Sequence, residues 1–92
     1  MKIVFRIMDT DASRAQRAET LLYATMRTNG IEGRVGQVFE HLEFSRMGLK
    51  DLPALELNGF VLSQGRPLSE ELLADICWRL AEARQKIDVR TS

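Results

Sequence analysis

Two short apolar runs, at about 54–58 and 60–64, constrain the fold more than any other part of the chain. Asn58-Gly59 separates them, and this dipeptide tolerates well the two positive φ angles of a type I′ turn. A proline step, Leu52-Pro53, precedes the first run. The segment therefore predicts a two-stranded antiparallel hairpin that is entered through a proline.

The rest of the chain alternates strand and helix patterns. Ile3, Phe5 and Ile7 form one apolar face, which predicts a strand at about 2–8, and a further strand is predicted at about 34–39. A helix between these two strands makes them parallel, with a right-handed crossover. The order β-α-β-α-β-β-α predicts one α/β domain over all 92 residues, with a four-stranded mixed sheet and helices on both faces.

Three helices are predicted, at about 13–29, 41–47 and 69–87. Ser13 with Gln16 fits a capping box at the start of the first helix, and Gly30 fits its end. Ser69 is expected to cap the last helix. In that helix one apolar stripe is expected to face the sheet, formed by Leu73, Ile76, Leu80, Ala83 and Ile87.

Composition excludes several classes of function. Thirteen basic and thirteen acidic residues cancel, so no overall positive field draws in nucleic acid or an anionic membrane. No segment approaches the ~20 apolar residues that span a bilayer. One cysteine excludes an intramolecular disulfide, and with one histidine it leaves too few ligands for structural zinc. We therefore expect a cytoplasmic protein without cofactor or metal, and with neither nucleic acid nor membrane as a partner.

The element order, the Leu52-Pro53 step, the Asn58-Gly59 turn and the helix start Ser69-Glu-Glu-Leu-Leu resemble the thioredoxin-like superfamily. The likeness is closest to its small, glutaredoxin-sized redox-active disulfide proteins. The resemblance implies a cis peptide bond before Pro53, which exposes the backbone of Leu52 to an extended peptide.

In that family a reactive Cys-x-x-Cys pair lies between the first strand and the first helix, where the positive helix end stabilises a thiolate. Here the loop reads Met8-Asp-Thr-Asp-Ala-Ser-Arg14 and holds no cysteine. The simplest alignment places Thr10 and Ser13 at the two cysteine positions. A hydroxyl has too high a pKa to replace a thiolate without a paired base, so we expect no catalytic residue and no dithiol–disulfide exchange.

Two functions from different classes fit this resemblance. The first is a redox-inactive module that binds a protein or peptide through the former active-site face, at Thr10, Asp11, Ala12, Ser13, Leu52 and Pro53. The second is a thiol- or glutathione-linked redox protein whose chemistry comes from a ligand or from a partner's cysteine. Ser13 would then orient the bound thiol, and Arg14 and Arg66 are the nearby basic groups. A purely structural subunit is the third possibility.

Two residues of the last helix have alternative interpretations. Cys77 is either a small, partly buried residue at the margin of the core or a reactive thiol, and its distance along the chain from the loop before the first helix favours the core. Trp78 faces away from the apolar stripe, among polar neighbours. It is therefore either covered by the tail at 88–92 or part of an interface, for which a homodimer is the simplest.

Five further polar residues have predicted roles. Asp9 and Asp11 lack the further ligands of a metal site, which favours cap and turn roles. Arg6 is predicted to form a structural pair with Glu56 on the neighbouring strand, with an anion site as the alternative. His41 is predicted to be a surface residue, with acid–base chemistry as the alternative.

Overall fold

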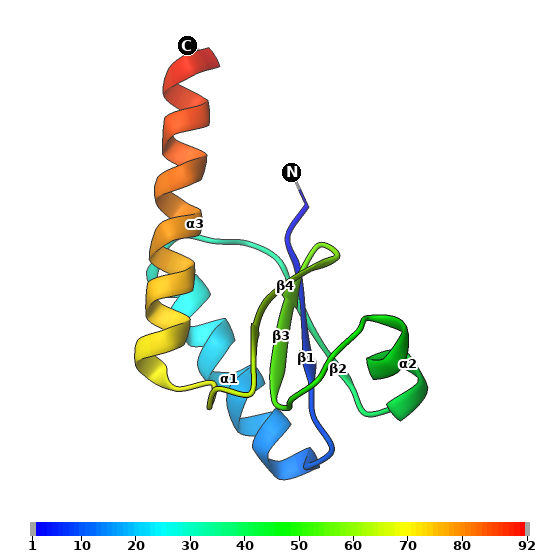
Figure 1. Cartoon of the computed structure of the whole chain (residues 1–92). Helices are drawn as coiled ribbons and strands as arrows, with labels where there is room; N and C mark the ends of the chain where they lie inside the picture. The colour runs from blue at the N-terminus through cyan, green and yellow to red at the C-terminus, as the bar shows by residue number, and fades with distance from the viewer. Residues whose placement is uncertain (1, 92) are drawn as a thin grey trace.

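The computed structural model describes residues 2–91, and the side chains of residues 2–85. It is an α/β structure with a four-stranded mixed sheet and three helices (Figure 1). The elements in chain order are β1 (Val4–Met8), α1 (Ala12–Thr28), β2 (Arg34–Val38), α2 (His41–Arg46), β3 (Ala54–Leu57), β4 (Phe60–Gln64) and α3 (Glu70–Thr91). This is the order of elements that the sequence predicts.

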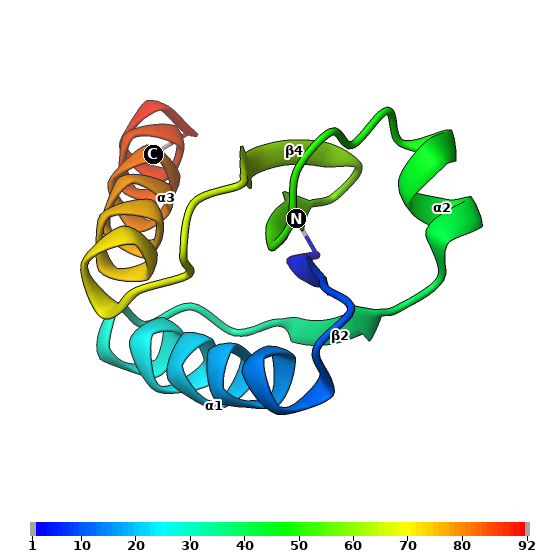
Figure 2. The same cartoon turned by 60° about the horizontal axis from the view of Figure 1, so that its bottom comes forward.

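The sheet has the strand order β2-β1-β3-β4, so β2 and β4 are its two edges. β1 and β2 pair in parallel, while the β1–β3 and β3–β4 pairs are antiparallel. In Figure 2 the edge strand β2 lies toward the bottom of the view and the other edge strand, β4, lies at the top. α1 and α3 lie on the left of this sheet and α2 lies on its right, so helices cover both faces, as predicted.

The hairpin forms as predicted from the turn residues. Asn58 and Gly59 have φ angles of 48° and 94°, and Leu57 pairs with Phe60 across the turn. Asn58 also ties the turn to the first strand, because its Oδ1 accepts from the Val4 N–H at 2.8 Å. At the other end of β3 the peptide bond between Leu52 and Pro53 is cis.

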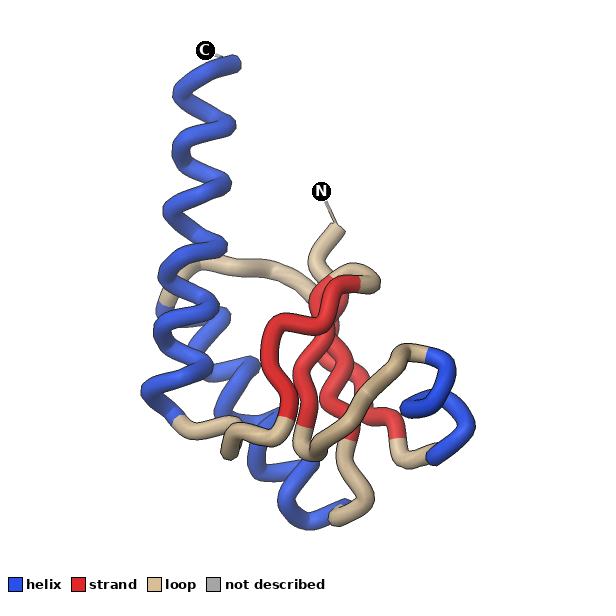
Figure 3. Tube along the Cα trace, viewed as in Figure 1, coloured by secondary structure: helices blue, strands red, loops and turns tan. Residues whose placement is uncertain are grey.

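Figure 3 shows the helices in blue. Their boundaries lie within one residue of the predicted ones, except for the end of α3. α1 begins at Ala12, and its N-cap is Asp11, whose carboxylate accepts from the Arg14 N–H at 3.0 Å. The predicted capping box at Ser13 is therefore wrong, because Ser13 already lies inside the helix. α3 is capped by Ser69 as predicted but continues past residue 87 to Thr91, in a stretch without glycine or proline to stop it.

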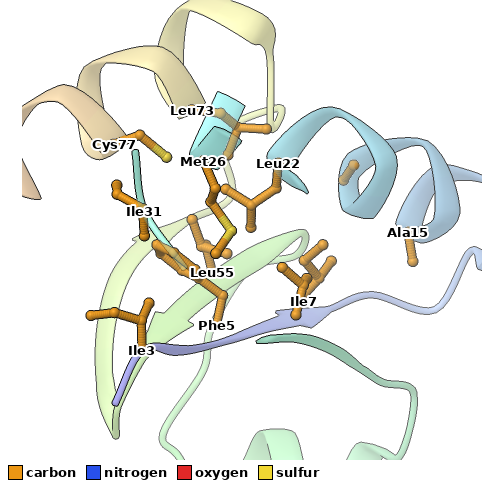
Figure 4. Packing of buried hydrophobic residues seen from close by; sticks show 12 residues of the cluster. Ile3, Phe5, Ile7, Ala15, Leu22, Met26, Ile31, Leu55, Leu73 and Cys77 are labelled. Atoms are coloured by element: carbon orange, nitrogen blue, oxygen red, sulfur yellow. The ribbon is translucent and has the colours of Figure 1, made fainter. Parts of the chain in front are cut away.

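The main core lies between the sheet and the layer of α1 and α3 (Figure 4). Phe5 and Ile7 of β1 meet Leu22 of α1 and Leu73 of α3 there. Cys77 is fully buried in this cluster rather than at its margin. Cys77 is buried because α3 packs on α1, whereas the predicted stripe considered only the sheet.

The packing of α3 on α1 also accounts for a second difference on this helix. Ala81 packs against the core, whereas Ala83 of the predicted stripe is exposed. Ile76 and Leu80 are half-buried against the core, as expected for the stripe. Ile87, the last residue of the predicted stripe, lies outside the described side chains.

A smaller apolar cluster fills the opposite face of the sheet, beneath α2. Met8, Phe44 and Ala54 are its buried members, and Leu52 and Met47 pack against them. This cluster fixes the loop that leads into β3. No helix in the described residues is long and apolar enough to cross a bilayer.

Candidate functional site

A hollow of about 460 Å³ opens between α1, the start of β3 and the loop before α3. We call it the Pro53 hollow. Its lining is formed by Asp9, Arg14, Arg17, Ala18, Leu21, Pro53, Pro67, Leu68 and Ser69. Most of its surface is apolar, and its polar groups are two arginines, one carboxylate and one hydroxyl. Such a concave, mainly apolar site with a few polar groups is the usual form of a binding pocket.

The helix α1 supplies one wall of the Pro53 hollow. Arg14, Arg17, Ala18 and Leu21 are spaced three or four residues apart, so they share one face of this helix. The facing wall is formed by Pro53 and by the segment Pro67–Ser69 that leads into α3. The hollow is therefore apolar in its middle and cationic along the first turns of α1.

Asp9 and Arg14 form an ion pair at one end of the Pro53 hollow. Both arginine donors are 2.6 Å from the carboxylate oxygens, Nε from Oδ2 and Nη2 from Oδ1. The carboxylate also accepts from the backbone N–H groups of Thr10 and Asp11, at 2.7 Å and 3.2 Å. Asp9 is only 1% exposed, whereas the Arg14 side chain is 47% exposed, so the arginine covers the buried carboxylate.

This geometry keeps Asp9 ionised. The hydrogen bonds from Arg14, which outweigh the effect of burial, hold the pKa of the Asp9 carboxyl below its ordinary value, and the two backbone N–H groups lower it further. The same pair raises the pKa of Arg14. Asp9 therefore neutralises most of the charge of Arg14, and Arg17 carries the remaining positive charge of the hollow.

The predicted binding residues separate into three groups. Pro53 is buried and lines the Pro53 hollow. The side chain of Leu52 packs into the cluster on the other sheet face. The residues from Thr10 to Ser13 are exposed around the first turn of α1 and do not line the hollow. The structure thus places the loop residues beside the hollow rather than in it.

Apart from Pro53 and Arg14, the residues that line this hollow were not predicted as members of the site: Asp9, Arg17, Ala18, Leu21, Pro67, Leu68 and Ser69. Asp9 was correctly assigned to a turn, but its pairing with Arg14 was not predicted. A signal was present on α1, where Arg14, Arg17 and Leu21 recur at helical spacing beside Ala18. It was not recognised because that face becomes a wall only once the segment before α3 packs opposite it.

The predicted pair of Arg6 and Glu56 is confirmed. These residues lie directly across from one another on β1 and β3. Arg6 donates both Nε, at 2.8 Å, and Nη2 to the same oxygen of Glu56. The second oxygen accepts from the Gly59 N–H at 2.9 Å, so this carboxylate also orders the hairpin turn.

The remaining candidates lie away from the Pro53 hollow. Cys77 is buried in the core, and burial raises the pKa of its thiol to about 11, which keeps it protonated. His41 is exposed, with its ring edge against Phe44. Trp78 is 58% exposed. The tail at 88–92, which covers it in one of the two predicted alternatives, lies outside the described side chains.

Asp9 and Asp11 serve as turn and cap residues, as predicted. In the part of the chain that the structure describes, no three His, Cys, Asp or Glu residues are grouped to hold a metal ion. No protein-family model, no curated protein and no solved structure matches this chain. The assignment of a function therefore depends on the geometry of the site.

Proposed function

We propose that this chain is a thioredoxin-like domain without thiol chemistry of its own, and that it binds an extended segment of a protein partner in the Pro53 hollow. The strand order and the parallel β1–β2 pair agree with the resemblance in the sequence. The loop between β1 and α1, where that family carries its cysteine pair, here ends in the helix cap Asp11.

The observation that carries the proposal is the lining of the hollow. Leu21, Pro53 and Leu68 offer an apolar surface, and Arg17 adds a positive charge beside it. No described ion pair engages the guanidinium of Arg17. The peptide segment that fits this surface has an apolar side chain close to a carboxylate. The apolar side chain would be buried in the hollow, and the carboxylate would pair with Arg17.

The absence of a thiol at the hollow supports a binding role over a redox role. The one cysteine of the chain is Cys77, which is buried in the core and protonated. Of the basic groups considered for glutathione, Arg14 is held by Asp9, and Arg66 lies at a different groove. The glutathione-linked function therefore has less support than the binding module.

The test is selection of a random short-peptide library displayed on phage against the purified protein, in the presence of reductant. We expect enrichment of peptides that carry Asp or Glu within a few positions of a large apolar residue. Fluorescence anisotropy then measures the affinity of one enriched peptide for the unmodified protein and for the Arg17→Glu variant. That substitution should weaken binding by about tenfold or more, because it replaces attraction with repulsion.

Arg27→Glu is the matched control, since it makes the same charge change on α1 but lies outside the Pro53 hollow. It should bind the peptide like the unmodified protein, and circular dichroism should show that both variants are folded. Failure to enrich any peptide, or equal loss in both variants, would contradict the proposal. Saturable binding of reduced glutathione that is lost in Arg17→Glu would instead support the glutathione-linked function.

A further inference from the structure

The two edges of the sheet are protected differently. On β2 the Val35 N–H donates to the Tyr23 hydroxyl of α1 at 2.9 Å. The side chain of Gln37 reaches Gln16 of the same helix at 3.3 Å. Side chains of α1 therefore lie along this edge and occupy one backbone donor, the Val35 N–H, that another strand would need.

The edge formed by β4 has no such cover in the described residues. Backbone hydrogen bonds reach Phe60–Ser63 only from β3. Three consecutive apolar side chains, Phe60, Val61 and Leu62, are exposed there, and Phe60 is 74% exposed. From Phe60 to Gly65 the chain carries no charge and no proline, which are two of the devices that prevent an edge strand from pairing. A third device is present, because the register shift opposite Leu55 and Glu56 leaves Leu62 as a bulge.

A groove of about 390 Å³ lies between this strand and α3, and we call it the β4–α3 groove. Its apolar lining comes from Leu57, Leu62, Leu72, Ile76 and Leu80. Asp75 and Arg79 border it on α3, and Arg66 borders it where the chain leaves β4; all three side chains are exposed. Asp75 and Arg79 are one helical turn apart and carry opposite charges, with Arg79 Nε 3.1 Å from the Asp75 carboxylate.

The pair of charges on α3 is complementary to itself. When a second copy of α3 approaches antiparallel, with a two-fold axis beside residue 77, each Asp75 faces an arginine and each Arg79 faces an aspartate. An uncharged strand such as β4 likewise meets no like charge when it pairs antiparallel with its own copy. The partner that fits this edge best is therefore a second copy of the chain.

We propose that the protein forms a homodimer in which β4 pairs antiparallel with β4 of the partner subunit. The two β4–α3 grooves then face each other, and Asp75 meets Arg79 of the partner subunit. A standard interface takes about 800 Å² from each partner, more than a five-residue strand edge supplies, so the flank of α3 is part of the interface. This groove shares no residue with the Pro53 hollow, so the dimer does not depend on the proposed function.

The first test is sedimentation velocity over a series of protein concentrations. The unmodified protein should show a monomer–dimer equilibrium, and Phe60→Lys should raise the dissociation constant by about tenfold or more, since it places a charge on the pairing edge. Leu42→Lys is the matched control. Leu42 is 65% exposed on α2, which lies on the other face of the sheet, and it does not line the β4–α3 groove, so its substitution should leave the equilibrium unchanged.

The second test uses charge reversal between two chains. Asp75→Arg and Arg79→Asp should each weaken self-association, because like charges then meet across the axis. A mixture of the two variants should form a heterodimer, because opposite charges then meet across the axis. Each variant chain has two like charges at 75 and 79, so an ion pair restored within one chain cannot explain this association. The proposal is overturned if the unmodified protein is monomeric at all concentrations, if Leu42→Lys rather than Phe60→Lys dissociates the dimer, or if the mixture does not associate.

Discussion

Asp9 and Glu56 are both buried carboxylates covered by a partly exposed arginine, yet they serve different parts of the molecule. Glu56 joins β1 to β3 through Arg6 and orders the hairpin turn through the Gly59 N–H. Asp9 joins the end of β1 to the first turn of α1 through Arg14, beside the Pro53 hollow. The same pairing is thus used once for the sheet and once at the candidate site.

The two pairs differ in what remains when the arginine is removed. Glu56 would keep only the N–H of Gly59 as a donor. Asp9 would keep two backbone donors, from Thr10 and Asp11. A buried carboxylate is costly in proportion to its missing partners, so the pair on the sheet should be the more important for stability.

The largest effect is expected for Arg6→Met, which preserves most of the side-chain volume but removes the charge. The substitution leaves Glu56, whose side chain is 4% exposed, without its cation. We expect the free energy of unfolding to fall by about 2–3 kcal/mol, below the upper range for buried pairs because Arg6 is partly in solvent. Urea denaturation measures this loss.

The double variant Arg6→Met/Glu56→Gln is the control for this effect. A neutral amide needs no cation, so the double variant should recover part of the lost stability. If it is as unstable as Arg6→Met alone, the loss comes from packing of the arginine stem rather than from the uncompensated carboxylate.

An intermediate effect is expected for Asp9→Asn. At neutral pH it should lower the free energy of unfolding by about 1–2 kcal/mol, because the amide replaces a charge-assisted contact to Arg14. The pKa of Asp9 is lowered in the folded protein, so its stabilising effect is present above the ordinary value of 3.8 and is lost as the pH falls through the lowered pKa.

The difference between Asp9→Asn and the unmodified protein should therefore shrink in acid. Urea denaturation at a series of pH values from neutral downward measures it. A difference that stays constant below pH 3.8 would show that the amide perturbs packing and that ionisation of Asp9 contributes little.

The sheet pair was predictable from the sequence, and the site pair was not. Alternation along β1 and β3 puts Arg6 and Glu56 on one face of neighbouring strands, so strand order and register suffice to bring them together. Asp9 and Arg14 are five residues apart across a strand-to-helix turn. Their contact depends on where α1 begins, and the prediction placed that start at Ser13 instead of Ala12.

The same limit applies to the Pro53 hollow. Strands, helices, the hairpin and the order of elements follow from periodicity and turn residues, which act over a few positions. The hollow has Pro53 from one loop, Leu68 from another and Arg17 from a helix. Its shape depends on how α3 and the segment before it pack on α1, and local sequence patterns do not specify that packing.

The variant most informative about the site is Arg14→Met. Asp9 keeps its two backbone donors, so the loss of stability should be smaller than for Arg6→Met. Removing the cation raises the pKa of Asp9 toward its ordinary value, and the acid-induced loss of stability should begin at higher pH.

Binding of an acidic peptide should also weaken in Arg14→Met, because the carboxylate of Asp9 then faces the Pro53 hollow without its counter-charge. Peptide anisotropy on both variants, under conditions where both are folded, separates the two roles: Arg6→Met should bind normally, and equal affinity of the two would remove Arg14 from the binding site.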